Sequence, residues 1–113
     1  MTVVSDLDAG RTPDGRILAD AVRSLLRTLS AVAPGRSVEV RIPPYGAIQC
    51  VPGPRHTRGT PPNVVETDPV TWVSLATGRL AWGDALAQGR LHASGPRADL
   101  SDYLPLVRPE ERT

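Results

Sequence analysis

The residues with the most chemical character lie in one proline-rich loop, GPRHTRGTPP, at positions 53–62. Arg55, His56 and Arg58 place two guanidinium groups and an imidazole close together in the sequence. Guanidinium groups bind carboxylates and phosphates through paired hydrogen bonds, so this loop could hold the anionic headgroup of a ligand. The alternative is a solvated loop whose arginines pair with neighbouring carboxylates, because short clusters of this kind are common on protein surfaces.

A second arrangement of interest pairs Cys50 with His56 as a nucleophile and its base. No third residue that would orient the histidine can be identified, and a lone cysteine in a strand is usually a small buried hydrophobe. His92 falls on the polar side of a predicted strand, where we expect it to be exposed. The spacing of these three residues matches no zinc site. We therefore expect no catalytic residue, no metal and no cofactor.

The composition indicates one small domain with no overall charge field. The chain has 113 residues, and its 13 basic residues, all of them arginine, nearly balance 12 acidic ones. Dispersed charge of this kind does not favour binding of nucleic acid. Trp72 and Trp82 fall on predicted helices rather than beside the arginines, which argues against stacking on bases. One cysteine fits a reducing cytoplasm, and no signal peptide or membrane-length apolar run is present. We expect a cytoplasmic protein without stable membrane insertion.

The first half of the chain predicts a helix followed by strands. Residues 1–12 lack a periodic pattern and predict a disordered lead-in. Apolar residues from Ile17 to Val32 recur at helical spacing, and Pro34-Gly35 ends this predicted helix. Alternation predicts strands at residues 37–42, 45–51 and 63–67, the first two as an antiparallel pair.

The stretch from Glu66 to Val107 predicts two short helices, a strand and a third helix. Asp68 followed by Pro69 is an N-cap followed by proline at the first helical position. Gly78 and Gly89 are typical of residues that end helices. The predicted elements are a helix up to Gly78, a second one around Trp82–Leu86, a strand at 91–95 and a last helix at 98–104.

Within this stretch, the phrase LATGRLAWGDALAQGRLHASG (residues 75–95) resembles the sterol carrier protein family, in particular its small stand-alone bacterial members. The resemblance extends over residues 64–107 and, less strongly, over residues 17–51. It implies an α+β, sterol-carrier-like fold with a long N-terminal helix, a small four-stranded sheet, mixed or antiparallel, two short helices and a closing C-terminal helix. The domain would span residues 13–108, after the disordered lead-in at 1–12 and before a tail at 109–113.

By this resemblance the function would be non-catalytic binding of lipids with a fatty-acyl or sterol-like apolar body, with transfer of the bound lipid as an extension of that role. Short helices pack less densely than long ones, and this half of the chain is rich in large apolar side chains that could line a cavity. The predicted lipid-binding residues are Trp72, Leu75, Leu80, Trp82, Leu86, Leu100, Tyr103 and Leu104.

The alternative is that the same side chains fill the interior and leave no cavity, as protein cores normally do. The chain would then be an interaction or accessory domain that contacts a protein partner or forms a homodimer. An apolar cavity favours the carrier, whereas a dense core with an exposed apolar patch favours the partner domain.

Overall fold

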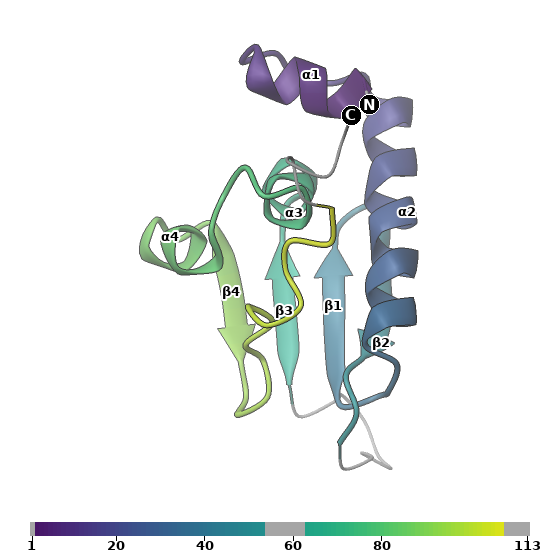
Figure 1. The fold of residues 1–113 in the computed structure, drawn as a ribbon, viewed down its shortest axis with the longest axis vertical. Coiled ribbons are helices and arrows are strands. Elements are labelled where there is room, and N and C mark those ends of the chain that lie inside the picture. Colours follow the sequence, from purple (N-terminus) through teal and green to yellow (C-terminus); the bar gives the residue numbers. More distant parts are fainter. Residues whose placement is uncertain (1, 54–62, 108–113) are drawn as a thin grey trace.

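A computed structural model describes residues 2–53 and 63–107, which form a four-stranded sheet packed against helices (Figure 1). The strands lie in the order β2-β1-β3-β4. The outer pairs are antiparallel and the central pair, β1 with β3, is parallel. The sheet is therefore mixed, and the predicted α+β class is confirmed. The elements are α1 (Thr2–Asp8), α2 (Gly15–Val32), β1 (Val38–Ile42), β2 (Gly46–Cys50), β3 (Val64–Thr67), α3 (Pro69–Ala76), α4 (Trp82–Ala87) and β4 (Leu91–Ser94).

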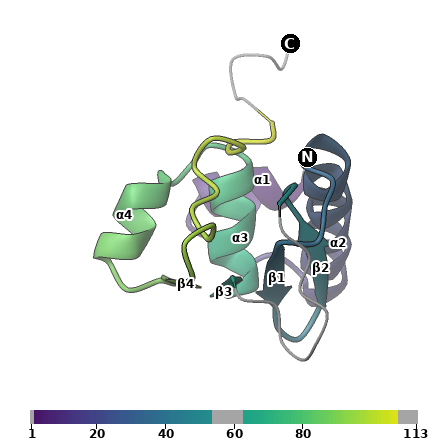
Figure 2. The ribbon, with the colours of Figure 1, turned by 90° about the horizontal axis from the view of Figure 1, so that it is seen from below.

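The sheet is apolar on one face and polar on the other. Val38, Val40 and Ile42 of β1 are fully buried, and α2 and α3 lie on this side (Figure 2). The residues between them, Glu39 and Arg41, point to the opposite face, which carries none of the described helices (Figure 2). Alternation along β1 thus places its apolar residues against the helices and its charges toward solvent.

The long predicted helix is confirmed as α2. Asp14 caps its start by accepting a hydrogen bond from the Arg16 backbone N–H at 2.9 Å. Ile17 and Val32, which the pattern assigns to the apolar stripe, are nevertheless 40% and 56% exposed. They lie in the first and last turns, at the ends of the buried stripe. That stripe consists of Leu18, Ala19, Ala21, Val22, Leu25, Leu26 and Leu29.

The two short helices are also confirmed, with the predicted caps. The carboxylate of Asp68 accepts from the Thr71 backbone N–H at 3.0 Å and from the Thr71 hydroxyl at 2.6 Å. Pro69 opens α3, and Gly78 and Gly89 follow α3 and α4 with φ of 80° and 69°. Glycine adopts this left-handed conformation readily, which is why it commonly ends helices.

The predicted disordered lead-in is wrong, because residues Thr2–Asp8 form α1. Val3 and Val4 are 1% and 3% exposed, and the helix packs against α2 and α3. A seven-residue helix is unstable by itself and depends on such packing. The sequence pattern did not reveal it because so short a segment shows barely two turns of periodicity.

The predicted closing helix at residues 98–104 is absent, and a turn stands in its place. The Tyr103 N–H donates to the carbonyl of Leu100 at 3.0 Å, which closes one turn. Pro105 then disfavours helical geometry in the residue before it and has no N–H to donate. The chain instead crosses to α3, where the N–H groups of Leu106 and Val107 both donate to the carbonyl of Ala76, at 2.8 and 3.0 Å. We call residues 95–107 the C-terminal segment.

Candidate ligand-binding site

Trp72 fixes the position of α3 on α2. Its side chain is 1% exposed, and its indole Nε1–H donates to the carbonyl of Val22 at 3.3 Å. Leu75, one turn later, is 2% exposed in the same buried cluster. Buried indoles normally find a partner for their N–H group, so this contact holds both the ring and the helix in place. Two of the predicted lipid-binding residues therefore belong to the packed core.

The C-terminal segment is anchored at both ends and in its middle. At its start, the buried Asn63 side chain accepts from the Arg97 N–H at 2.9 Å and donates to the carbonyl of Ser37 at 2.7 Å. In its middle, Leu100 is fully buried. Its end is held at the carbonyl of Ala76, the last residue of α3. The segment therefore runs over the apolar side of the molecule, from the start of β3 to the last residue of α3 (Figure 1).

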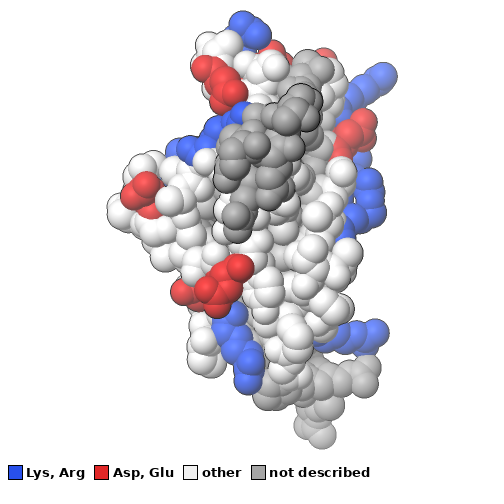
Figure 3. Space-filling view, viewed as in Figure 1, with Lys and Arg blue, Asp and Glu red and all other residues white. Residues whose placement is uncertain are grey.

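Four of the predicted lipid-binding residues are half-buried. Leu80 comes from the α3–α4 connection, Trp82 opens α4, and Tyr103 and Leu104 come from the C-terminal segment. All four pack against the buried core without being fully enclosed by it. These four predicted residues therefore keep part of their apolar surface open. On the face shown in Figure 3, the described acidic and basic side chains are interspersed, in keeping with the dispersed charges of the sequence.

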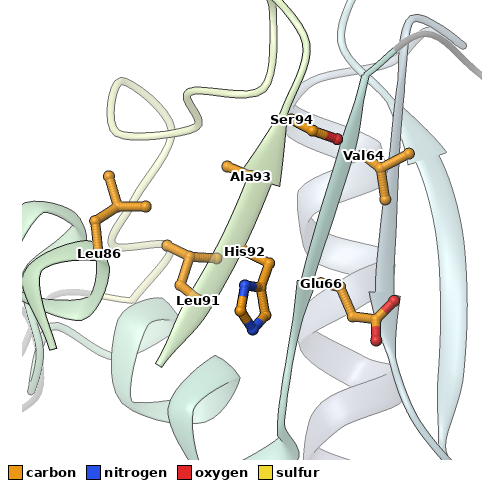
Figure 4. Close-up of a pocket in the computed structure, with 7 residues that line it drawn as sticks. All are labelled: Val64, Glu66, Leu86, Leu91, His92, Ala93 and Ser94. Carbon is orange, nitrogen blue, oxygen red and sulfur yellow. The ribbon is translucent and has the colours of Figure 1, made fainter. Parts of the chain in front are cut away.

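The most open of the predicted residues is Leu86. It is 44% exposed on α4 and lines a surface hollow of about 580 Å³ beside β4 (Figure 4). The other seven predicted lipid-binding residues do not line this hollow. Its walls are Val64, Glu66, Leu86, Leu91, His92, Ala93 and Ser94.

Sequence reasoning did not identify this hollow as a site, although His92 is exposed as expected. Glu66 of β3 and His92 of β4 are opposite each other in the register and lie on the same sheet face (Figure 4). They also line a neighbouring hollow of about 380 Å³, together with Asp68 and Arg90. The signal was present in the alternation of both strands, but the β3–β4 pairing that joins them is a long-range contact that spacing does not reveal.

The open sheet face carries a row of paired charges. The register aligns Ala47, Arg41, Glu66 and His92 across the four strands. Arg41 donates to the carboxylate of Glu39 at 2.7 Å, and this hydrogen bond, with the charges of Glu39 and Glu66, raises the pKa of Arg41 above its ordinary value. Opposite charges on neighbouring positions neutralise one another. This face therefore has the character of a solvated surface rather than of an apolar ligand site.

The proposed headgroup residues Arg55, His56 and Arg58 lie outside the described residues, so their role stays a prediction. Cys50 is fully buried, as expected for a small hydrophobe in a strand. Burial raises the pKa of its thiol to about 11. The thiolate is the nucleophilic form, so the environment of Cys50 works against the nucleophile–base pair.

The described residues offer neither a membrane-spanning helix nor a metal-binding cluster. Within residues 2–53 and 63–107, no helix combines the length and apolar character that crossing a bilayer requires. Over the same residues, no three side chains of histidine, cysteine, aspartate or glutamate come together in a way that would hold a metal ion.

The comparisons with known proteins agree with the fold. No curated protein matches the chain. A family whose description reads "Bacterial SCP ortholog" matches residues 14–106, which leaves α1 outside the match and includes every other helix and strand of the described structure. This match covers far more than half of the sequence. The chain therefore belongs to the family of bacterial SCP orthologs, a bacterial branch of sterol-carrier-like proteins.

Proposed function

We propose that the protein is a non-catalytic lipid carrier that binds the apolar body of a fatty-acyl or similar ligand. Membership in the bacterial SCP family over residues 14–106 is the observation that carries this proposal. The physical requirement is apolar surface that a ligand can cover, because each methylene removed from water contributes about 0.8 kcal/mol. The half-buried group of Leu80, Trp82, Tyr103 and Leu104 offers such surface.

In this proposal the ligand lies between α3, α4 and the C-terminal segment. Leu80, Trp82, Tyr103 and Leu104 contact its tail, while the buried residues Trp72, Leu75 and Leu100 form the floor beneath them, and Leu86 lies at the outer end. Leu100 and the hydrogen bonds at both ends anchor the C-terminal segment, so room for the ligand must come from movement of the half-buried side chains. These side chains contain no polar pattern that would select a sterol ring over an acyl chain.

The headgroup of the ligand would meet Arg55, His56 and Arg58. Paired guanidinium groups suit a carboxylate or phosphate, which is the polar end that most simple lipids present. We place the protein in the cytoplasm, where its single buried cysteine needs no partner.

A titration with a fluorescent long-chain fatty acid tests this proposal. Delipidated protein should bind the probe saturably, and Leu104→Asp should weaken binding at least about tenfold, because an apolar contact is replaced by a charge. Val32→Asp is the matched control, since Val32 is 56% exposed on α2 and should not contact the ligand. If the wild type shows no saturable binding, or if both variants weaken it equally, the carrier function is wrong.

A second candidate function, an interaction domain with a filled core, is favoured by one feature. Leu86 is 44% exposed beside the hollow between α4 and β4, and a partially apolar hollow next to an edge strand suits a protein partner. This candidate predicts no fatty-acid binding together with self-association or partner binding that Leu86→Ser abolishes. Sedimentation velocity of the wild type and of this variant would show whether the chain pairs with itself.

A further inference from the structure

Helix α1 is an addition to the family domain that covers one end of its core. It lies outside the matched residues 14–106 and crosses the end of the molecule above α2 and α3 (Figure 1). Val3 is 1% exposed, and α1 contacts α3, the helix that carries Trp72 and Leu75. Undocking α1 would therefore expose apolar core that adjoins the proposed site.

One ion pair fastens the last turn of α1 to the ligand-binding region. Arg79 donates through Nε and Nη2 to the two carboxylate oxygens of Asp8, each at 3.1 Å. The Arg79 side chain is only 17% exposed, and its Nη1 also donates to the carbonyl of Thr77 at 2.9 Å. Arg79 is the direct neighbour of Leu80 in the α3–α4 connection. The contact thus joins α1 to the segment from which a predicted lining residue projects.

Because α1 is short, it docks and undocks as a unit. The helix has seven residues, so its structure depends on docking. It is joined to α2 through Gly10, which adopts φ of 75° and allows the chain to turn there. Short terminal helices with few buried side chains open at much lower free energy than the core elements do.

We propose that α1 is a lid on the ligand site, which undocks to admit and release the apolar ligand, and that the Asp8–Arg79 pair sets how often it opens. The inference rests on the proposed carrier function for its ligand. The lid, α1, lies before the residues that match the family. Opening should speed both binding and release, so the dissociation constant should change less than either rate.

Stopped-flow release of a fluorescent long-chain fatty acid from the full-length protein tests the lid. Asp8→Asn should speed release about two- to fivefold, as expected for loss of a partly exposed ion pair. Asp6→Asn is the matched control, because Asp6 pairs with Arg11, just beyond the same helix, at 3.2 Å. Val3→Asp should speed release at least about tenfold, whereas Ser5→Asp, at an exposed position of α1, should not.

Hydrogen exchange of the unliganded protein reports lid opening without any ligand. In Asp8→Asn the amides of α1 should exchange faster, while those of α2 keep their protection. The charge-reversed double variant, Asp8→Arg with Arg79→Asp, should restore both slow exchange and slow release of the probe. Faster exchange of α1 without faster release would overturn the lid and leave the carrier function standing. A wild-type protein that binds no probe would overturn the carrier function, and the lid with it.

Discussion

Cys50 illustrates how the fold decides the chemistry of a side chain. It ends β2, opposite Val38 in the register, and points into the apolar layer between the sheet and the helices. Burial without a compensating charge disfavours the thiolate and raises the pKa of the thiol to about 11. The burial was expected, because a lone cysteine in a strand is usually a small buried hydrophobe. The size of the effect on its pKa depends on α2 and the rest of the core, which sequence spacing does not describe.

This pKa predicts a specific loss of stability in alkali. The unfolded thiol ionises near its ordinary value of 9.0, whereas the native thiol keeps its proton until about pH 11. The contribution is fully present below pH 9 and is lost as the pH rises toward 11. Urea unfolding at about pH 8 and about pH 10 should show a larger fall in the free energy of unfolding for the wild type than for Cys50→Ala. If the free energy of unfolding fell equally in the two proteins, the raised pKa of Cys50 would not be the cause of the loss.

At the scale of elements, the turn between α2 and β1 depends on Gly35. Its φ is 150°, and a Cβ at this position would overlap the backbone of Val51. The same turn is tied to the end of β2, because Val51 donates its N–H to the carbonyl of Ala33 at 2.7 Å and accepts from the Ser37 hydroxyl at 2.8 Å. The proline and glycine predicted the end of the helix but not this close approach of two backbones.

Replacing Gly35 should therefore be severe. Gly35→Ala should lower the free energy of unfolding by about 3 kcal/mol or more, since two backbone segments must separate. Gly83→Ala offers the matched control, because a Cβ there meets nothing within 4 Å. Gly83 lies within α4, so alanine should stabilise the protein by about 0.5–1 kcal/mol. Urea denaturation of both variants measures these changes, and similar values for the two would refute this account of the turn.

The elements that sequence predicted are those whose signals are local. Asp68 with Pro69, and the glycines after α3 and α4, define helix ends through nearest neighbours alone. α1 and the C-terminal segment were mispredicted because their structure depends on distant partners. Val3 is buried against α2 and α3, and Leu106 bonds to Ala76. Local pattern cannot show contacts of this kind.

At the scale of the whole molecule, the sheet order is what brings the candidate site together. The chain passes from the edge strand β2 to β3 on the far side of β1, so that β1 and β3 become parallel neighbours. α3 and α4 then return the chain to β4 at the opposite edge, and the C-terminal segment runs past β3 to α3 (Figure 1). The family resemblance anticipated the class of this fold. The residue pattern alone did not specify the strand order, since alternation is the same for parallel and antiparallel neighbours.

The burial of each predicted lipid-binding side chain bears on whether the protein is a carrier or a domain with a filled core. Trp72, Leu75 and Leu100 are buried as core residues would be, whereas Leu80, Trp82, Tyr103 and Leu104 keep part of their surface open. Sequence identified all of these as apolar. It could not separate those that fill the interior from those that a ligand could cover, because that distinction depends on how much of each side chain other segments of the fold cover.

Native mass spectrometry of the protein purified from its own host tests the carrier function most directly. The account predicts a species heavier than the bare chain by the mass of one lipid, which delipidation removes and added fatty acid restores. Leu104→Asp should carry less of this lipid than Val32→Asp, because only the first change lies in the proposed site. A folded protein that always shows its bare mass, both as purified and after incubation with fatty acid, would contradict the carrier function.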